Sequence, residues 1–218
     1  MTDRRRTCLG APVNFSGQDL TCVRGGRTVF HTLSFHVAAG DALLLRGPNG
    51  CGKSSLLRLV AGFQAPASGT FQWDEGAGFT DPDRHRERVC YAGHLDAVKP
   101  ALTVAEGLQF WVDLAGGKEN TDQALRHWGL GAIADLPGAY LSAGQRKRLN
   151  LARLSVSRAE LWLLDEPTVS LDDAAVKTLA EVIHEHQAKG GLAMIATHMD
   201  LDVEGAQTLN LEPFARAQ

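Results

Sequence analysis

Short apolar runs alternate with longer segments of helical spacing along most of the chain. Within 19–47, runs rich in β-forming residues are separated by glycine-containing turns, a pattern that predicts strands. The segment 53–63 has leucines at helical spacing, and the segments 69–75 and 88–93 again predict strands. Helical periodicity then continues through 103–157, after which strands and helices alternate again. We therefore expect a parallel α/β core that is interrupted by a mostly helical insertion.

The start of the helical insertion carries a local signal. Thr103 stands three residues before Glu106, which is the spacing of a capping box at the beginning of a helix. From these patterns we expect residues 1–16 to form a flexible tail and residues 17–218 to form a single domain. Within that domain, the helical subdomain is expected to cover residues 98–157.

The composition limits the partners that the chain can have. Its 218 residues are enough for one α/β domain with a substantial core, and 44% of them are hydrophobic. A net charge of −3 argues against nucleic acid as a partner, because nucleic-acid-binding domains usually carry a basic face. Four scattered cysteines without a C-x-x-C pair argue against a zinc or disulfide framework and for a reducing compartment. No apolar run approaches the roughly 20 residues that a membrane-spanning helix needs.

A phosphate-binding loop follows the predicted strand "DALLLRG". Gly47-x-x-x-x-Gly52-Lys53-Ser54 matches the P-loop pattern and is followed by a helical segment, which is the context that the motif requires. Its glycines let consecutive backbone N–H groups point at phosphate oxygens, and the following helix N-terminus adds partial positive charge. Lys53 is expected to neutralise phosphate charge, and Ser54 to bind Mg²⁺. The residues expected to bind nucleotide here are Gly47, Pro48, Asn49, Gly50, Cys51, Gly52, Lys53, Ser54 and Ser55.

Acidic residues end a later strand. The run "LWLLDEP" suits a strand that is buried on both faces, so Asp165 and Glu166 emerge at its carboxyl end, where ligands bind in open α/β sheets. Asp165 is expected to bind Mg²⁺, and Glu166 to polarise a water that attacks the γ-phosphate. His198 follows another apolar strand and is expected to reach the same phosphate. Acids at a strand end are also common as solvated turn residues, and a histidine after a strand is more often structural than catalytic.

Five motifs, taken in order, make the chain resemble the nucleotide-binding domains of ABC (ATP-binding cassette) ATPases. They are "GPNGCGKSS" as Walker A, "LSAGQ" as the signature, "LWLLDEP" as Walker B, "SLD" as the D-loop and "THMD" as the switch-histidine loop. The resemblance covers nearly everything from 19 to 211. It implies an α/β P-loop NTPase fold with a small antiparallel β subdomain and an inserted helical subdomain, and an ATPase that uses ATP and Mg²⁺.

The resemblance also implies a second subunit. In that family, two domains pair head to tail and bind ATP between one P-loop and the partner's signature. The signature residues Ser142, Ala143, Gly144 and Gln145 would then contact ATP on another subunit. Glu166 would be the general base, with Lys53 and His198 as the other catalytic residues, and Asp172 would form part of the link across the interface. With one set of motifs, the chain is expected to pair with a second copy of itself or with another ABC ATPase domain.

Three cationic residues follow the signature directly. Cations at the N-terminal end of a helix oppose its dipole, so Arg146 and Arg148 need not bind phosphate. We expect them to face acidic neighbours or the interface.

Two positions depart from the common pattern of the family. Arg24 stands where many relatives have an aromatic residue that stacks on adenine; its guanidinium can stack on a purine, and a solvent-facing arginine is equally consistent with the sequence. His94 stands where relatives have a glutamine that reaches Mg²⁺ and the attacking water. Imidazole can bind a metal or a water, but it is shorter than glutamine and titrates near neutrality.

The chain is also similar to the ATP-binding subunits of the haem exporters of cytochrome c maturation. The similarity lies in the short length of the cassette and in the segments "YAGHLDAVKPALTVAEGLQFW" and "LSAGQRKRLNLARL". This resemblance implies a heme-transporting translocase that lies peripherally on the cytoplasmic face of the bacterial inner membrane, bound to integral membrane subunits. ATP hydrolysis would drive release of a haem-loaded chaperone. A soluble ABC ATPase in metal-cluster assembly or another non-transport role is the alternative, and a nucleotide-gated scaffold without useful turnover is a third possibility.

Overall fold

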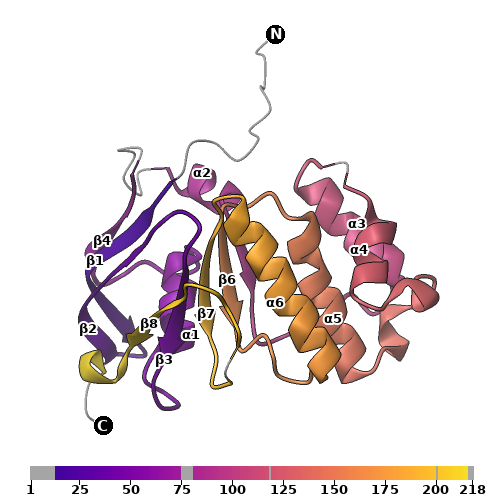
Figure 1. The fold of residues 1–218 in the computed structure, drawn as a ribbon. Helices are drawn as coiled ribbons and strands as arrows, with labels where there is room; N and C mark the ends of the chain where they lie inside the picture. Colours follow the sequence, from indigo (N-terminus) through magenta and orange to yellow (C-terminus); the bar gives the residue numbers. More distant parts are fainter. Residues whose placement is uncertain (1–12, 75–80, 118, 200, 216–218) are drawn as a thin grey trace.

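The fold contains two β-sheets and a group of helices beside them (Figure 1). This computed structural model describes residues 13–74, 81–117, 119–199 and 201–215. An antiparallel sheet with the order β2-β1-β4 comprises β1 (Phe15–Arg24), β2 (Arg27–Val37) and β4 (Ser68–Trp73). A parallel sheet with the order β5-β6-β7-β3-β8 comprises β3 (Ala42–Arg46), β5 (Val89–Ala92), β6 (Leu161–Asp165), β7 (Leu192–Ala196) and β8 (Gln207–Asn210).

Helices cover the parallel sheet on both faces, and a further group of helices lies beside it. In Figure 1, α6 crosses in front of the sheet, α1 lies behind it, and the helical group lies to the right. The α-helices are α1 (Lys53–Val60), α2 (Pro82–Glu87), α3 (Val104–Leu114), α4 (Thr121–His127), α5 (Ala143–Ala152) and α6 (Asp173–Ala188). Short 3₁₀ turns are η1 (Gly131–Ile133), η2 (Gly138–Tyr140), η3 (Arg153–Val156) and η4 (Glu212–Phe214). Among the described residues, no helix is both long and apolar enough to span a bilayer.

Strand β6 explains why the central runs of the sequence are continuously apolar. All five of its residues are buried, because side chains alternate between two packed faces. Leu161 and Leu163 pack with α1 and the antiparallel sheet, whereas Trp162 and Leu164 pack with α6 and the helical group. The strand therefore joins two hydrophobic cores, and its acidic end has a fixed position between them.

The expected element boundaries hold in part. Helix α3 begins at the expected place, with Thr103 and Glu106 forming the predicted capping box. The helical periodicity that continues through residue 157 in the sequence is not helical to its end: α5 ends at Ala152 and passes into the 3₁₀ turn η3. Most of the expected tail lies outside the described residues, but Phe15 already begins β1 and is fully buried, so regular structure starts before the expected boundary at residue 17.

Candidate nucleotide site

The P-loop turns from β3 into α1 with a backbone that requires glycine. Gly47 has φ 134° and Gly52 has φ 110°, in the region that favours glycine. A Cβ at Gly52 would lie 2.8 Å from the Phe30 ring, and one at Gly47 would lie 2.8 Å from Cys51 Sγ. Both glycines are therefore needed for the loop to lie this close to its neighbours, and the turn exposes the N-terminus of α1 to a ligand.

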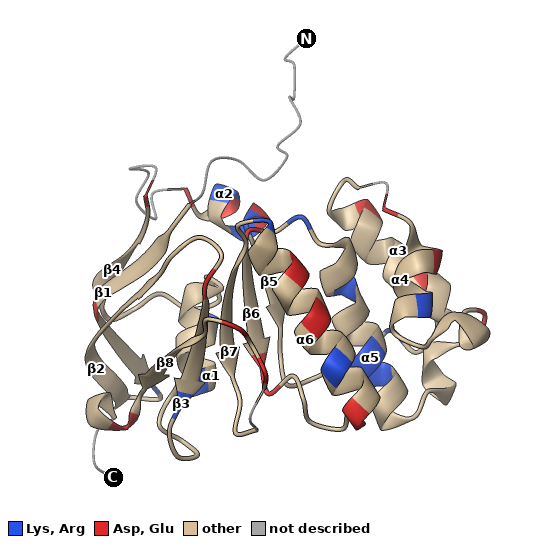
Figure 2. Ribbon diagram, in the orientation of Figure 1, with Lys and Arg blue, Asp and Glu red and all other residues tan. Residues whose placement is uncertain are grey.

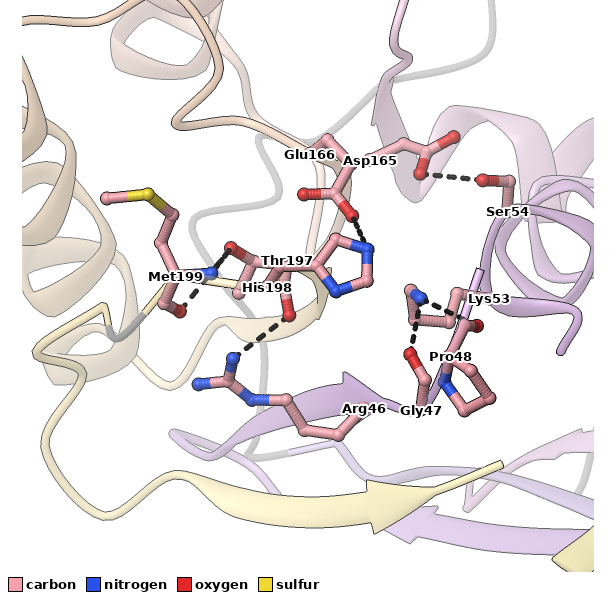
Figure 3. Close-up of polar contacts among 10 residues, drawn as sticks. All are labelled: Arg46, Gly47, Pro48, Lys53, Ser54, Asp165, Glu166, Thr197, His198 and Met199. Carbon is pink, nitrogen blue, oxygen red and sulfur yellow. Dashed lines mark hydrogen bonds and ion pairs between the residues drawn. The ribbon is translucent and has the colours of Figure 1, made fainter. Parts of the chain in front are cut away.

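Lys53, the first residue of α1, lies over the loop that precedes it. Its Nζ donates hydrogen bonds to the carbonyl oxygens of Gly47, at 2.8 Å, and Pro48, at 3.3 Å (Figure 3). The residue is only 7% exposed, so the ammonium group is held within the loop rather than in solvent. These neutral acceptors leave the positive charge uncompensated and available to an anion.

Ser54 and Asp165 meet although they are far apart in the sequence. The Ser54 hydroxyl donates to Asp165 Oδ1 at 2.9 Å, and the Tyr91 hydroxyl donates to Oδ2 at 3.4 Å. Burial raises the pKa of Tyr91, with the Asp165 charge adding to the effect, so the phenol stays protonated and can keep donating. Hydroxyl and carboxylate oxygens are the donors that Mg²⁺ prefers, and this pair fits such an ion.

Glu166 has an unusual backbone conformation at the end of β6. Its φ is 48°, a left-handed value that costs a side-chain-bearing residue about 1–3 kcal/mol. The backbone N–H donates to the carbonyl of Ala196 at 2.8 Å, which ties the turn to the end of β7. The carboxylate lies 3.2 Å from His198 Nε2 (Figure 3). The strained turn therefore directs the acid toward the histidine from the neighbouring strand.

The segment after β7 is held by its own polar contacts. Arg46 Nη1 donates to the carbonyl of Thr197 at 3.0 Å, and the N–H of Met199 donates to Thr197 Oγ1 at 3.1 Å (Figure 3). Thr197 is fully buried, whereas about half of the His198 side chain is exposed. This arrangement fixes the backbone and leaves the imidazole accessible.

A cavity of about 1030 Å³ connects these groups with the turn between β1 and β2. Its lining residues are Arg24, Gly26, Arg27, Thr28, Val29, Asn49, Gly50, Gly52, Lys53, Ser54, Ser55, Glu166 and Ala215. Sequence reasoning found Arg24 but missed Gly26, Arg27, Thr28, Val29 and Ala215. Arg27 pairs with Arg24 across the Gly25-Gly26 turn, a hairpin signal that could have indicated it. Ala215 reaches the cavity through a bridge to Phe30 that the sequence does not reveal.

The signature residues are not part of this cavity lining. Ser142 caps α5: its Oγ accepts from Gln145 N at 3.2 Å, while Gln145 Oε1 accepts from Ser142 N at 2.8 Å. Ser142 and Ala143 are exposed, and Gly144 packs so closely that a Cβ there would lie 3.0 Å from the Ser170 carbonyl oxygen. The start of α5 thus presents a free surface next to the segment that follows Glu166.

Asp172 and His94 also lie outside the cavity lining. Asp172 caps α6, with Oδ1 accepting from Ala175 N at 2.9 Å. His94 is exposed in the segment that leaves β5, two residues after Ala92, which pairs with Leu164. Because β5 and β6 are parallel neighbours, this segment leaves the sheet at the edge where Asp165 lies. Neither side chain touches the Ser54–Asp165 pair or the Glu166–His198 pair in the described structure.

Comparison with known proteins identifies the family. A family model described as ABC transporter matches residues 30–169. The cytochrome c biogenesis ATP-binding export protein CcmA of Paramagnetospirillum magneticum is 50% identical over 210 residues, covering 94% of this chain and 96% of that protein. The chain belongs to the CcmA family of ABC transporter ATPases. CcmA of Rhodospirillum rubrum is likewise 50% identical, covering 94% of this chain and 88% of that protein.

A solved structure agrees on the fold. A putative ABC transporter ATP-binding protein from Pyrococcus furiosus superimposes with a TM-score of 0.80 at 21% identity, covering 93% of this chain and 100% of that one. The family and the P-loop fold with its antiparallel and helical parts, both expected from the sequence, are confirmed. The roles expected for individual residues stay predictions.

Proposed function

We propose that this chain is the ATP-hydrolysing subunit of an export complex that serves cytochrome c maturation, with release of a haem-loaded chaperone as its output. One observation carries the ATPase part: the P-loop cation, the Ser54–Asp165 pair and the Glu166–His198 pair converge at one sheet edge. Half of the residues are identical to those of a cytochrome c biogenesis export protein over nearly the whole chain, which supports the transport role.

Phosphate binding is the first step of the proposed mechanism. Lys53 exchanges its two carbonyl acceptors for β- and γ-phosphate oxygens, which are stronger partners because they carry charge. The N-terminus of α1 and the loop N–H groups complete the contact. Arg24 and Arg27 also line the cavity, from the hairpin between β1 and β2, and the base would lie against them.

Hydrolysis requires a base and a charge near the γ-phosphate. Ser54 and Asp165 would hold Mg²⁺, which supplies positive charge to the phosphate oxygens when bound. Glu166 accepts the proton of the attacking water, and its turn places the carboxylate beside the cavity that Lys53 also lines. His198, which now contacts Glu166, orients the acid and can move toward the γ-phosphate.

Pairing supplies the part that one chain lacks. The start of α5, where Ser142 and Ala143 are exposed and Gly144 is partly buried, does not line this chain's own cavity and would close on the nucleotide of a partner. Gln145 keeps that end ordered through the capping box, and Asp172 contributes from the start of α6. The functional unit is then a homodimer or a pair with a second ABC ATPase domain.

A second cavity is suited to the membrane subunits. It measures about 320 Å³, lies beside the His94 segment and is mostly apolar. Its lining residues are Ala97, Val98, Lys99, Leu102, Thr103, Gly107, Phe110, Trp111, Leu149 and Asn150. We propose that the chain binds the membrane subunits through this cavity, which we call the apolar groove. The chain would then lie peripherally on the cytoplasmic face of the inner membrane. It would form one domain over 17–218, with a helical subdomain over about 98–157.

Gentle detergent purification of the tagged full chain from its own membranes tests the proposal. Mass spectrometry should identify integral membrane subunits, and the complex should hydrolyse ATP in a Mg²⁺-dependent manner. Phe110→Glu, which places a charge in the apolar groove, should release the subunits, whereas Lys177→Glu, at an exposed position of α6, should not. Recovery of a wholly soluble complex would instead support the metal-cluster alternative and contradict the transport role.

A further inference from the structure

The hairpin between β1 and β2 presents two arginines to the nucleotide cavity. Arg24 and Arg27 lie directly opposite each other in the strand register, on either side of the Gly25-Gly26 turn. Residues paired in this way send their side chains to the same face of the sheet, with about 5 Å between their Cβ atoms. Both arginines are exposed, and both line the cavity. The hairpin therefore places two guanidinium side chains together beside the cavity.

Neither guanidinium has a partner that explains its position. Among the described residues, no hydrogen bond or ion pair involves the side chain of Arg24 or of Arg27. Elsewhere, on α4 and α6, basic residues are interspersed with Asp and Glu (Figure 2). Like charges directly opposite each other on two strands destabilise the pair. A repulsion that is kept without a compensating contact is expected where a residue serves a ligand rather than the fold.

The hairpin has a fixed position against the P-loop. Cys22 and Phe30, which pair further along the same two strands, are fully buried. A Cβ on Gly52 would lie 2.8 Å from Phe30 Cδ1 and 2.9 Å from Val29 Cγ1, so β2 packs directly on the start of α1. The two arginines are thus carried by a strand that is anchored beside the phosphate-binding loop.

The cavity lining shows which groups can meet the base of a nucleotide. If the P-loop holds the phosphates, the lining that remains comes from the hairpin, Glu166 and Ala215. The two arginines only donate hydrogen bonds, and among the described hairpin residues of the lining only Thr28 has a side chain that can also accept one. No aromatic side chain is among the described residues that line the cavity. The base would therefore meet guanidinium planes and hydrogen-bond donors.

A wall of donors favours a base that has acceptors along its edge. Guanine presents two neighbouring acceptors, N7 and O6, whereas adenine presents N7 beside the donating N6 amino group. The fork of one guanidinium can donate to N7 and O6 at the same time, and a second guanidinium can lie over the face of the purine. With adenine, the stacking remains but the fork meets an acceptor and a donor, so only one hydrogen bond forms.

We infer that Arg24 and Arg27 determine the base specificity of this site, and that it takes purine nucleoside triphosphates in general, with GTP used as well as ATP. One guanidinium covers the face of the base, and the other donates to its N7 and O6 edge. The inference rests on the proposed function and names the substrate class of the same site. None of the five sequence motifs includes either arginine.

Turnover of ATP, GTP and inosine triphosphate by the detergent-purified membrane complex tests the inference. Inosine triphosphate has the N7 and O6 acceptors of GTP without its N2 amino group, so it reports on that edge alone. We expect kcat/KM for both to be at least about one third of the value for ATP. A lower value for either, with ATP turned over, would overturn the inference. Absence of turnover with every nucleotide would instead contradict the proposed function.

The double variant Arg24→Lys/Arg27→Lys separates recognition of the base from charge. Lysine keeps both positive charges but loses the planar fork, so it cannot donate to two neighbouring atoms in the same way. The ratio of kcat/KM for GTP to that for ATP should fall about fivefold or more, since a bidentate contact is lost. The affinity for inorganic triphosphate, measured by calorimetry, should stay within about twofold, because the phosphate contacts do not involve this pair.

Arg126→Lys, at an exposed position of α4 outside the cavity lining, is the matched control and should leave the ratio and the affinity unchanged. The urea midpoint of the double variant should equal that of wild type, because both arginines are exposed. A GTP-to-ATP ratio that does not change would overturn the inference. A matching loss of affinity for inorganic triphosphate would also overturn it, because the arginines would then bind phosphate rather than the base.

Discussion

Acidification should destabilise this protein through a histidine that is remote from the nucleotide. His186 lies on α6 with 6% of its surface exposed, and its ring stacks on Trp162 with 3.8 Å between centroids and 3° between planes. Its Nε2 lies 3.2 Å from the carbonyl oxygen of Leu192. Burial lowers the pKa of His186 to about 4 from the ordinary value of 6.5, so the folded protein holds it neutral at physiological pH.

The direction in which stability changes with pH follows from the number of protons that the folded and unfolded states bind. Between about pH 6.5 and pH 4 the unfolded chain binds a proton at His186 that the folded protein does not, so stability falls as the pH falls. The contribution of neutral His186 to the free energy of unfolding is complete above the pKa that His186 has in the unfolded chain. It is lost as the pH falls towards the pKa of His186 in the folded protein. From about pH 8 to about pH 5.5 the loss is about 1 to 2 kcal/mol, and below pH 4 it reaches about 3 kcal/mol.

His186→Phe isolates this effect, because phenylalanine keeps the stacking on Trp162 and cannot titrate. Its lost hydrogen-bonding nitrogen gives an offset in the free energy of unfolding that does not depend on pH. Urea unfolding at several pH values should show wild type losing about 1 to 2 kcal/mol more than the variant between pH 8 and pH 5.5. His85, whose pKa burial also lowers, is present in both proteins and cancels. Parallel pH profiles of wild type and variant would refute the reasoning.

Three further predictions concern the nucleotide site. Lys53→Ala should weaken ATP binding by about tenfold or more, since it removes a charged hydrogen-bond donor; near-normal affinity by calorimetry would contradict this role. Glu166→Gln should retain ATP binding but lower turnover by about 10²- to 10⁴-fold and accumulate an ATP-bound dimer on gel filtration, and wild-type turnover would exclude Glu166 as the base. Alkylation of Cys51 should block ATP binding, because the P-loop has no space for an added group beside the thiol: a Cβ on Gly47 would already lie 2.8 Å from Cys51 Sγ. Cys51→Ala is the control, and full ATPase activity after complete labelling of Cys51 would contradict this prediction.

The sheet edge could be predicted because parallel strands leave simple marks in a sequence. Apolar runs that end in polar residues identified β6 and β7, and parallel pairing brings their carboxyl ends together, with Asp165 opposite Ala196. Local rules also worked at the start of α3, where Thr103 and Glu106 lie within four residues of each other. Both signals depend on neighbours in the sequence.

Other features of the site depend on distant contacts. Nothing near Glu166 in the sequence indicates its left-handed backbone, which is held by the hydrogen bond from its N–H to Ala196. The position of Ala215 at the cavity depends on a bridge to Phe30, far away in the sequence. Three cations follow the signature, and the sequence does not distinguish them, but Lys147 alone of the three is buried in the folded protein.

Helix α5 has an exposed start and a buried face. Its first turn is exposed, and there Ser142 and Ala143 would contact the partner's nucleotide. The buried face begins one turn later, and Asn150 in the helix and Arg153 just after it are hydrogen-bonded to Ala97 and Tyr91 in the segment that leaves β5. A helix of 10 residues is about 15 Å long and too short to bend appreciably, so a displacement at its first turn reaches its other end almost undiminished. Nucleotide bound by the partner would thereby shift the segment that carries His94 in the chain that supplies the signature.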